Sequence, residues 1–209
     1  MIDENARRCV AFHGATLVAA GELKDVAVAA KGVTDRDPYA QLLFFDAVTS
    51  EPIEVDLRGT PEEVERRVAL SSAAAVTEST VADGTETDEG QHPPRSRGPG
   101  RPKLGVVARE VTLLPRHWDW LATQSGGASV ALRRLVDEAR KANVEIDRRR
   151  AAQTSAYRFI SAMAGERPGF EEATRALFAG DASRFALLTA DWPPDVRDHA
   201  RTLGLSGAV

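Results

Sequence analysis

Residues 105–141 read GVVAREVTLLPRHWDWLATQSGGASVALRRLVDEARK, and this stretch decides how the chain is expected to fold. Its first part, residues 106–114, is rich in β-branched and apolar side chains and predicts a β-strand. Pro115 is expected to end that strand, because proline has no backbone N–H to donate to a neighbouring strand. A single strand leaves its own backbone groups unpaired, so this strand requires a partner strand.

Two helices are predicted after the strand. Residues 117–123 have the apolar spacing of a short helix. Gly126 and Gly127 then break the chain, and Ser129 is predicted as the N-cap of a second helix. The apolar face of this second helix consists of Leu132, Leu135, Val136, Ala139 and Ala142.

The order of strand, Leu114-Pro115, helix, glycine turn and Ser-capped helix resembles the ribbon-helix-helix fold of bacterial DNA-binding dimers. In that family two chains pair their strands into an antiparallel ribbon that enters the major groove, and the second helix begins at a phosphate. The resemblance implies a homodimer that binds double-stranded DNA. The implied contact residues are Arg109 and Thr112 on the ribbon and Gly127, Ser129 and Arg133 at the helix start.

These residues also have purely structural interpretations, which stay open. Arg109 can be a solvated charge paired with Glu110, and Thr112 can simply fill a strand position. Gly127 and Ser129 can form only a tight turn and a cap.

Two phases of the strand are also open. The family buries the residues one, three and five before the proline, which would place Leu114 inside and Arg109 outside. Hydrophobic alternation favours the opposite phase, with Val107, Val111 and Leu113 inside, and a slip of one residue turns every side chain over.

The letters LPRHWDWL, GGAS and LVDEAR within the same stretch also resemble a widespread bacterial family of unknown function. This second resemblance extends over most of the chain and implies no established activity.

Residues 72–103 are predicted to be a flexible, disordered linker, because they have no apolar periodicity. Within it, residues 99–103, PGRPK, resemble the Gly-Arg-Pro core of an AT-hook. That resemblance implies a basic arm in the minor groove of A·T-rich DNA. The arm consists of Arg97, Arg101, Pro102 and Lys103; the alternative is that they only keep the linker extended and soluble.

The remaining segments predict an α+β fold. Residues 8–71 predict a small module in the order ββαββα, with strands at 10–12, 16–20, 42–45 and 53–57. Thr60, Pro61 and Glu63 predict the start of its last helix as a capping box. Residues 104–146 are the ribbon-helix-helix-like segment, and residues 150–205 predict C-terminal helices that form a small bundle or a dimer cover. Gly165 and Gly180 are expected to end two of these helices, Asp181 to cap a third, and residues 195–203 to form the last, closed by Gly204.

Two further motifs have competing interpretations. Trp118 and Trp120 point to different sides of a helix, so one is expected in the core and the other in a dimer interface; stacking on single-stranded nucleic acid is less favoured. The run Arg148-Arg149-Arg150 predicts a solvated helix face, with phosphate contact as the alternative.

Charge is unevenly distributed along the chain. Residues 1–93 carry 8 Lys and Arg against 18 Asp and Glu, a net charge of −10, whereas residues 94–150 carry 13 against 6, a net charge of +7. A local basic segment of this kind favours phosphate binding. The acidic N-terminal module favours binding of a protein partner instead.

The composition gives little support to catalysis. Cys9 is the only cysteine, and the four histidines do not have metal-ligand spacing. No P-loop, nucleophile elbow or dinucleotide fingerprint occurs. We therefore expect no catalytic residues, metal or cofactor. Residues 1–10 are polar and no apolar stretch is long enough for a membrane span, so a cytoplasmic protein without membrane contact is expected.

Together these patterns favour a homodimeric DNA-binding protein, sequence-specific or A·T-preferring, that acts as a transcriptional regulator. The alternative is a protein-interaction module, similar to an antitoxin, that dimerises and holds a partner without reading DNA.

Overall fold

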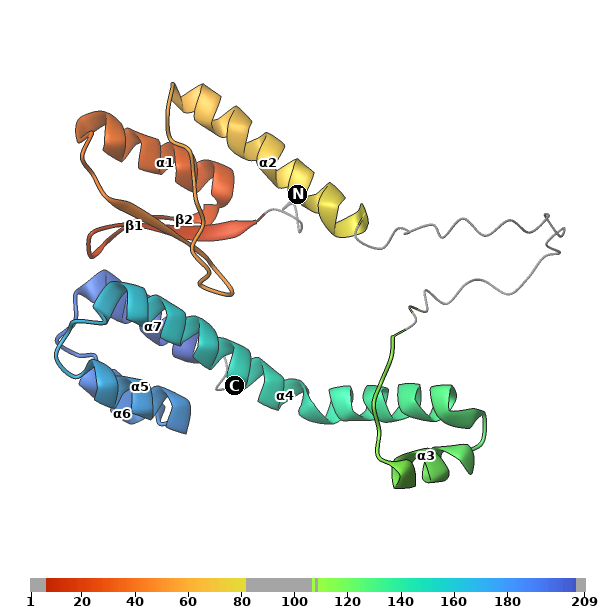
Figure 1. The fold of residues 1–209 in the computed structure, drawn as a ribbon. Helices are drawn as coiled ribbons and strands as arrows, with labels where there is room; N and C mark the ends of the chain where they lie inside the picture. Colours follow the sequence, from red (N-terminus) through yellow and green to blue (C-terminus); the bar gives the residue numbers. More distant parts are fainter. Residues whose placement is uncertain (1–6, 82–106, 108, 206–209) are drawn as a thin grey trace, which may run out of the picture. The chain divides into compact units, whose positions relative to one another are not determined.

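The computed structural model describes residues 7–81, 107 and 109–205. The chain is α+β and mostly helical, and it divides into two units, Met1–Ala82 with Val144–Val209, and Asp83–Asn143. The elements in chain order are β1 (Arg8–His13), β2 (Thr16–Glu22), α1 (Leu23–Arg36), β3 (Leu42–Asp46), α2 (Pro61–Val81), α3 (Pro115–Ala122), α4 (Gly127–Ala164), α5 (Phe170–Ala179), α6 (Ala182–Leu188) and α7 (Pro194–Leu205) (Figure 1).

The three strands form one antiparallel sheet in the order β2-β1-β3. Val10 of β1 lies opposite Ala20 of β2 on one side and Phe45 of β3 on the other. The register with β2 shifts between Ala11 and Phe12, as at a β-bulge. Because β1 is the central strand, both its edges are paired and its side chains face a covered layer on each side.

Alternation along β1 sends consecutive side chains into two separate cores. Cys9 and Ala11 pack with α1 and α2. Val10 and Phe12 pack with α4, α5 and α7, and Phe45 joins them from β3. Figure 1 shows α1 and α2 on one face of the sheet and α7 with the C-terminal part of α4 on the other.

Aromatic contacts join the N-terminal sheet to the C-terminal helices. The ring of Phe159 on α4 is 5.3 Å from that of Phe12 and 5.4 Å from that of Phe45, between centroids. The hydroxyls of Ser50 and Ser155, both buried, are 2.8 Å apart. The segments predicted as a separate module and a separate tail, residues 8–71 and 150–205, therefore share one core.

The capping box predicted at the start of α2 is present. The Glu63 carboxylate accepts a hydrogen bond from the Thr60 backbone N–H at 2.9 Å, and the Thr60 hydroxyl accepts one from the Glu63 N–H at 3.3 Å. The helix continues to Val81 and so extends past residue 72, where the linker was expected. Alanine has the highest helix propensity, and residues 73–75 are all alanine.

Residues 53–57 do not form the expected fourth strand. The only pairing there is an isolated bridge between Phe45 and Pro52, followed by a hydrogen bond from the Ile53 N–H to the Phe44 carbonyl at 2.9 Å. The alternating side chains of Ile53, Val55 and Leu57 still pack against the α1–α2 core. The alternation predicted the buried side correctly, but the order is ββαβα.

The predicted strand at residues 106–114 is likewise absent from residues 107 and 109–114, which the structure describes. A strand is defined by hydrogen bonds to a neighbour, and the sheet of β1, β2 and β3 does not include this segment. Helix α3 begins at Pro115 rather than at residue 117, with proline in its first turn.

Helix α4 is longer than predicted at both ends. It begins at Gly127, which places Ser129 in its first turn rather than at the N-cap. It continues without interruption through residues 146–150, where a boundary was expected, because residues 128–164 contain no glycine or proline. It ends at Ala164, before Gly165, as predicted.

Two local signals in the C-terminal segment are confirmed. Gly180 ends α5 with a φ of 72°, a left-handed conformation that glycine adopts readily. The Asp181 side chain caps α6 by accepting from the Arg184 N–H at 2.9 Å. Helix α7 begins at Pro194 and continues past Gly204, which was expected to end it, to Leu205.

Candidate nucleic-acid interface

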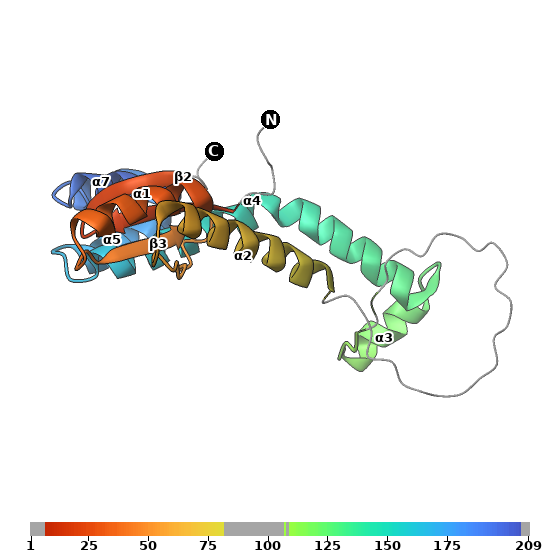
Figure 2. The same ribbon diagram turned by 90° about the horizontal axis from the view of Figure 1, so that it is seen from above.

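The unit Asp83–Asn143 contains a helical hairpin made of α3 and the N-terminal part of α4, which lie beside each other (Figure 2). The turn between them uses two consecutive glycines, Gly126 with a φ of 84° and Gly127 with a φ of 74°. A Cβ on Gly126 would lie only 3.1 Å from the Val130 side chain. Both conformation and space therefore require glycine at position 126.

This hairpin has a very small core. Leu121 and Ala131 are the only buried residues among 107 and 109–143 in the described chain. Beside them is an apolar pocket of about 270 Å³, lined by Leu113, His117, Trp120, Leu121, Leu132 and Leu135. The two helices by themselves bury too little apolar surface to stabilise an independent unit.

Many large apolar side chains of this unit remain exposed to solvent. Trp118 is 43% exposed and Trp120 48%. Neither is a core residue, contrary to the expectation for one of them. Further apolar side chains of this unit are also exposed: Val107, Val111, Leu114, Val130, Leu135 and Val136. A concentration of exposed apolar side chains marks a surface that binds another molecule.

The two residues predicted to read bases, Arg109 and Thr112, are both exposed. Among the described residues neither side chain forms a hydrogen bond or an ion pair, so Arg109 is not paired with Glu110. Leu113 is the one residue of 107 and 109–114 that is partly buried, and it lines the apolar pocket. Val107 and Val111, which hydrophobic alternation places on the same side as Leu113, are 58% and 56% exposed, so the described segment shows neither phase of a strand.

The residues predicted to hold a phosphate lie together at the start of α4. Gly127 begins the helix, and its N–H donates to the Gln124 carbonyl at 3.1 Å. Arg133 Nε donates to the Ser129 carbonyl at 3.2 Å, which turns the guanidinium back toward the first turn. The amides of a helix's first turn lack partners within the helix, so an anion is stabilised there.

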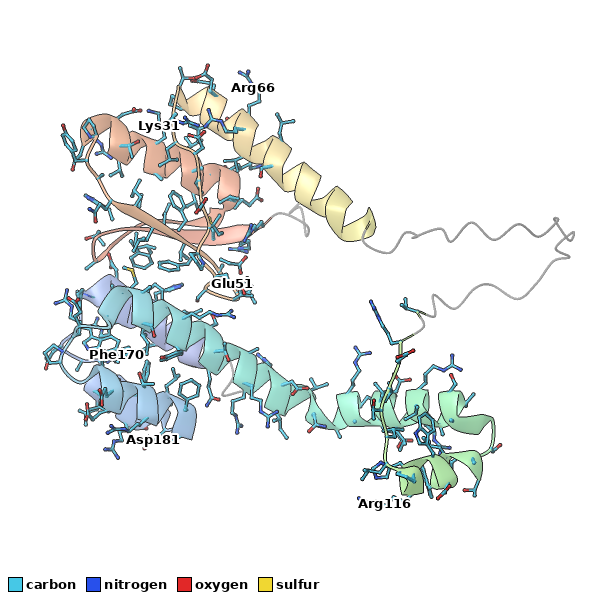
Figure 3. All side chains as sticks on the ribbon, in the orientation of Figure 1. Lys31, Glu51, Arg66, Arg116, Phe170 and Asp181 are labelled. Carbon is cyan, nitrogen blue, oxygen red and sulfur yellow. The ribbon has the colours of Figure 1, made fainter. Side chains whose placement is uncertain are left out.

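The residues of the predicted basic arm, Arg97, Arg101, Pro102 and Lys103, lie outside the described residues. A further basic residue, Arg116, was missed by the sequence reasoning. It is exposed in the first turn of α3 (Figure 3). Its position directly after Leu114-Pro115 was the available signal.

The described part of the chain contains no group of three or more His, Cys, Asp and Glu that could hold a metal ion. Burial raises the pKa of the Cys9 thiol to about 11, which keeps it protonated and poorly nucleophilic. No helix among the described residues has the length and apolar character needed to cross a membrane.

Comparison with known proteins places the chain by sequence alone. No curated protein and no solved structure matches it. A family model described as "Uncharacterized protein conserved in bacteria (DUF2239)" matches residues 8–204, nearly the whole chain. The chain therefore belongs to this bacterial family.

Proposed function

We propose that the protein is a homodimeric double-stranded-DNA-binding protein that regulates transcription. Its working module is the unit that contains α3 and the start of α4. The observation that carries the proposal is the exposed apolar surface of this unit, next to an unpaired segment that precedes a helix, a glycine turn and a second helix. That order is the one found in ribbon-helix-helix dimers.

The first step is pairing of two chains. Each of these apolar side chains has about half of its surface exposed. Burying that exposed half in a dimer contributes roughly 1 kcal/mol per side chain, because full burial contributes about 1.5–3 kcal/mol. Five such side chains from each of two chains then contribute about 10 kcal/mol, which is comparable with the 4–15 kcal/mol that association costs. Pairing of the two segments that precede Pro115 also satisfies their backbone groups.

The second step is contact with DNA phosphates. The basic segment at residues 94–150 supplies the charge, and the start of α4 supplies backbone amides near Arg133. In the proposal Gly127, Ser129 and Arg133 hold a phosphate. Arg97, Arg101 and Lys103, with Pro102, form the arm in the minor groove.

The phase of the ribbon determines which side chain meets the bases. With Leu113 inside, Thr112 faces outward, whereas the family phase turns Arg109 outward. Comparing the DNA affinity of Arg109→Ala with that of Thr112→Ala distinguishes the two phases. The more damaging substitution identifies the outward side chain.

Fluorescence anisotropy on random and A·T-rich duplexes, over a series of salt concentrations, tests DNA binding. We expect affinity to fall steeply with salt, because each phosphate contact contributes about −0.9 to the slope of log K against log salt. Arg133→Ala removes one contact per chain and should lower the steepness by about 2 in a dimer. The control is Arg175→Ala, an exposed arginine on α5 paired with Glu171. Absence of binding at low salt would refute the proposal.

The arm is tested separately. The double variant Arg101→Ala, Lys103→Ala should weaken binding to every duplex and reduce the salt slope. Unchanged affinity and slope would remove the arm from the proposal without affecting the ribbon.

Sedimentation equilibrium tests pairing of the chains. Val111→Glu places a charge on the segment before Pro115 and should shift the protein toward monomer. Leu187→Glu, on α6, is the control, because Leu187 is 75% exposed in the other unit and should leave the dimer unchanged. A monomeric wild-type protein at micromolar concentration would contradict the proposed pairing.

One observation favours an alternative function, a protein-interaction module that dimerises without DNA readout. With Leu113 inside, Glu110 faces the same outward side as Thr112, where DNA phosphates would repel it. Recovery of a stoichiometric protein partner without nucleic acid would support this alternative.

A further inference from the structure

A second pocket lies in the unit that contains the sheet, among α4, α5, α6 and α7. Its volume is about 510 Å³, which is the size of small-molecule sites. Apolar side chains, including Leu177 and Phe185, form part of its lining. Arg149 and Gln153 of α4 and Arg201 of α7 supply polar groups, and Asp181 contributes from the loop before α6 (Figure 3).

Of the three consecutive arginines at 148–150, only Arg149 lines the pocket. Arg148 lies 3.9 Å from the Glu145 carboxylate, and Arg150 lies 4.0 Å from that of Asp147. These two pairs fit the solvated helix face expected from the sequence. Arg149 lines the pocket and has no ion pair with any described residue.

Arg201 is held in place by neutral groups. Its Nε donates to the hydroxyl of buried Thr189 at 3.2 Å, and its Nη2 donates to the Ala186 carbonyl. No carboxylate of a described residue forms an ion pair with it; Asp198 on the same helix pairs with Arg197 at 2.7 Å. The guanidinium is thus positioned. The hydrogen bond from Arg197 lowers the pKa of the Asp198 carboxyl, and the charge of Arg201 helps to lower it without an ion pair between Asp198 and Arg201.

The single acid of the lining, Asp181, caps α6 through one carboxylate oxygen, which accepts from the Arg184 N–H at 2.9 Å, and it forms no ion pair with Arg149 or Arg201. Gln153 Nε2 donates to the Leu177 carbonyl at 2.8 Å, which fixes the amide against α5. The lining therefore combines an apolar surface with two guanidinium groups that form no ion pair with a described residue. Guanidinium groups bind carboxylates through paired hydrogen bonds, and the apolar surface suits a hydrocarbon body.

We propose that this pocket binds a small amphipathic carboxylate. Arg149 and Arg201 bind the carboxylate group, and Leu177 and Phe185 contact the apolar part of the ligand. The site does not depend on DNA binding, so failure of either proposal leaves the other in place.

Isothermal titration calorimetry of the full chain tests the site with benzoate and hexanoate as probes. Benzamide and hexanamide are the neutral counterparts, and inorganic phosphate is the anion without an apolar body. We expect both carboxylates to bind and neither amide nor phosphate to do so. Arg149→Ala should weaken carboxylate binding about tenfold, because it removes one charge-assisted interaction.

Arg148→Ala is the matched control, because it removes an adjacent exposed arginine that does not line the pocket. It should leave the affinity unchanged. The proposal is overturned if neither carboxylate binds at about 10 mM, a concentration that detects millimolar affinities. It is equally overturned if the amides or phosphate bind as tightly, or if Arg149→Ala and Arg148→Ala have the same effect. Circular dichroism of both variants verifies that the fold is intact.

Discussion

Phe12→Ala is expected to destabilise the C-terminal helices as much as the N-terminal sheet. Phe12 is fully buried on β1, and its ring contacts Phe159 of α4 and His199 of α7, at centroid distances of 5.3 and 5.8 Å. One substitution on the central strand therefore removes packing from two helices that lie far away in the sequence.

The size of the effect follows from the cavity that alanine leaves. A buried phenylalanine replaced by alanine costs about 3–5 kcal/mol. With a urea dependence of roughly 1–3 kcal/mol per molar, the unfolding midpoint should fall by about 1–5 M. Phe12→Leu leaves a smaller cavity and is the variant to use if Phe12→Ala does not fold.

Tryptophan fluorescence can report on the C-terminal helices alone. The chain has three tryptophans, and replacing Trp118 and Trp120 by phenylalanine leaves Trp192 as the only emitter. Trp192 is 4% exposed, and its Nε1–H donates to the Pro168 carbonyl at 3.3 Å. In this background, the urea transition of Trp192 reads the C-terminal helices, and far-UV circular dichroism reads the whole chain.

The control is Leu43→Ala, which alters the residue opposite Phe12 in the sheet register. Leu43 is 47% exposed, so its truncation should cost much less. A Trp192 transition that stays unchanged in Phe12→Ala, while circular dichroism shows a separate earlier transition, would refute the shared core.

Three other experiments test single residues. Burial lowers the pKa of His199, so below about pH 6.5 the unfolded chain binds a proton that the folded protein does not. As the pH falls below about 6.5, stability should therefore decrease, and His199→Phe should reduce this decrease in urea titrations; an unchanged pH dependence would contradict it. Thr60→Ala should cost about 1 kcal/mol by removing the cap of α2, and an unchanged thermal midpoint would count against the capping box. Cys9, buried and with its pKa raised to about 11, should react with a thiol reagent at pH 8 only after urea is added; rapid labelling of the folded protein would show that the thiol is accessible.

Local signals predicted much of the secondary structure because their causes are local. A capping box needs Thr60 and Glu63 within one turn, and the cap of α6 needs only Asp181 and the Arg184 N–H. Gly180 ends α5 through its own backbone conformation. None of these interactions depends on a distant segment.

The candidate interface was predicted in part. The helix–glycine–helix order and the position of Gly127, Ser129 and Arg133 at one helix start follow from sequence spacing. The strand before Pro115 does not, because pairing requires a second segment that the chain's own sheet does not provide. The hairpin likewise provides no second segment that covers Trp118 and Trp120, and both tryptophans of α3 remain exposed.

The arginine run at residues 148–150 repeats one residue type three times, yet only Arg149 lines the pocket among α4, α5, α6 and α7. The 3.6-residue turn of the helix directs each of the three to a different side. The groups that surround each side chain depend on how α5, α6 and α7, which follow α4 in the sequence, pack against it. Sequence spacing alone could not distinguish the paired arginines from the unpaired one.

The amino-acid sequence was sufficient to predict the caps of α2 and α6, the ends of α4 and α5 and the apolar side of residues 53–57, because capping, backbone conformation and periodicity act within a few residues. The segment that covers each apolar side followed only from the packing of elements that are distant in the sequence. The hydroxyls of Ser50 and Ser155 meet at 2.8 Å although 105 residues separate them. Apolar burial has no direction, so periodicity identifies a buried face but does not specify its partner.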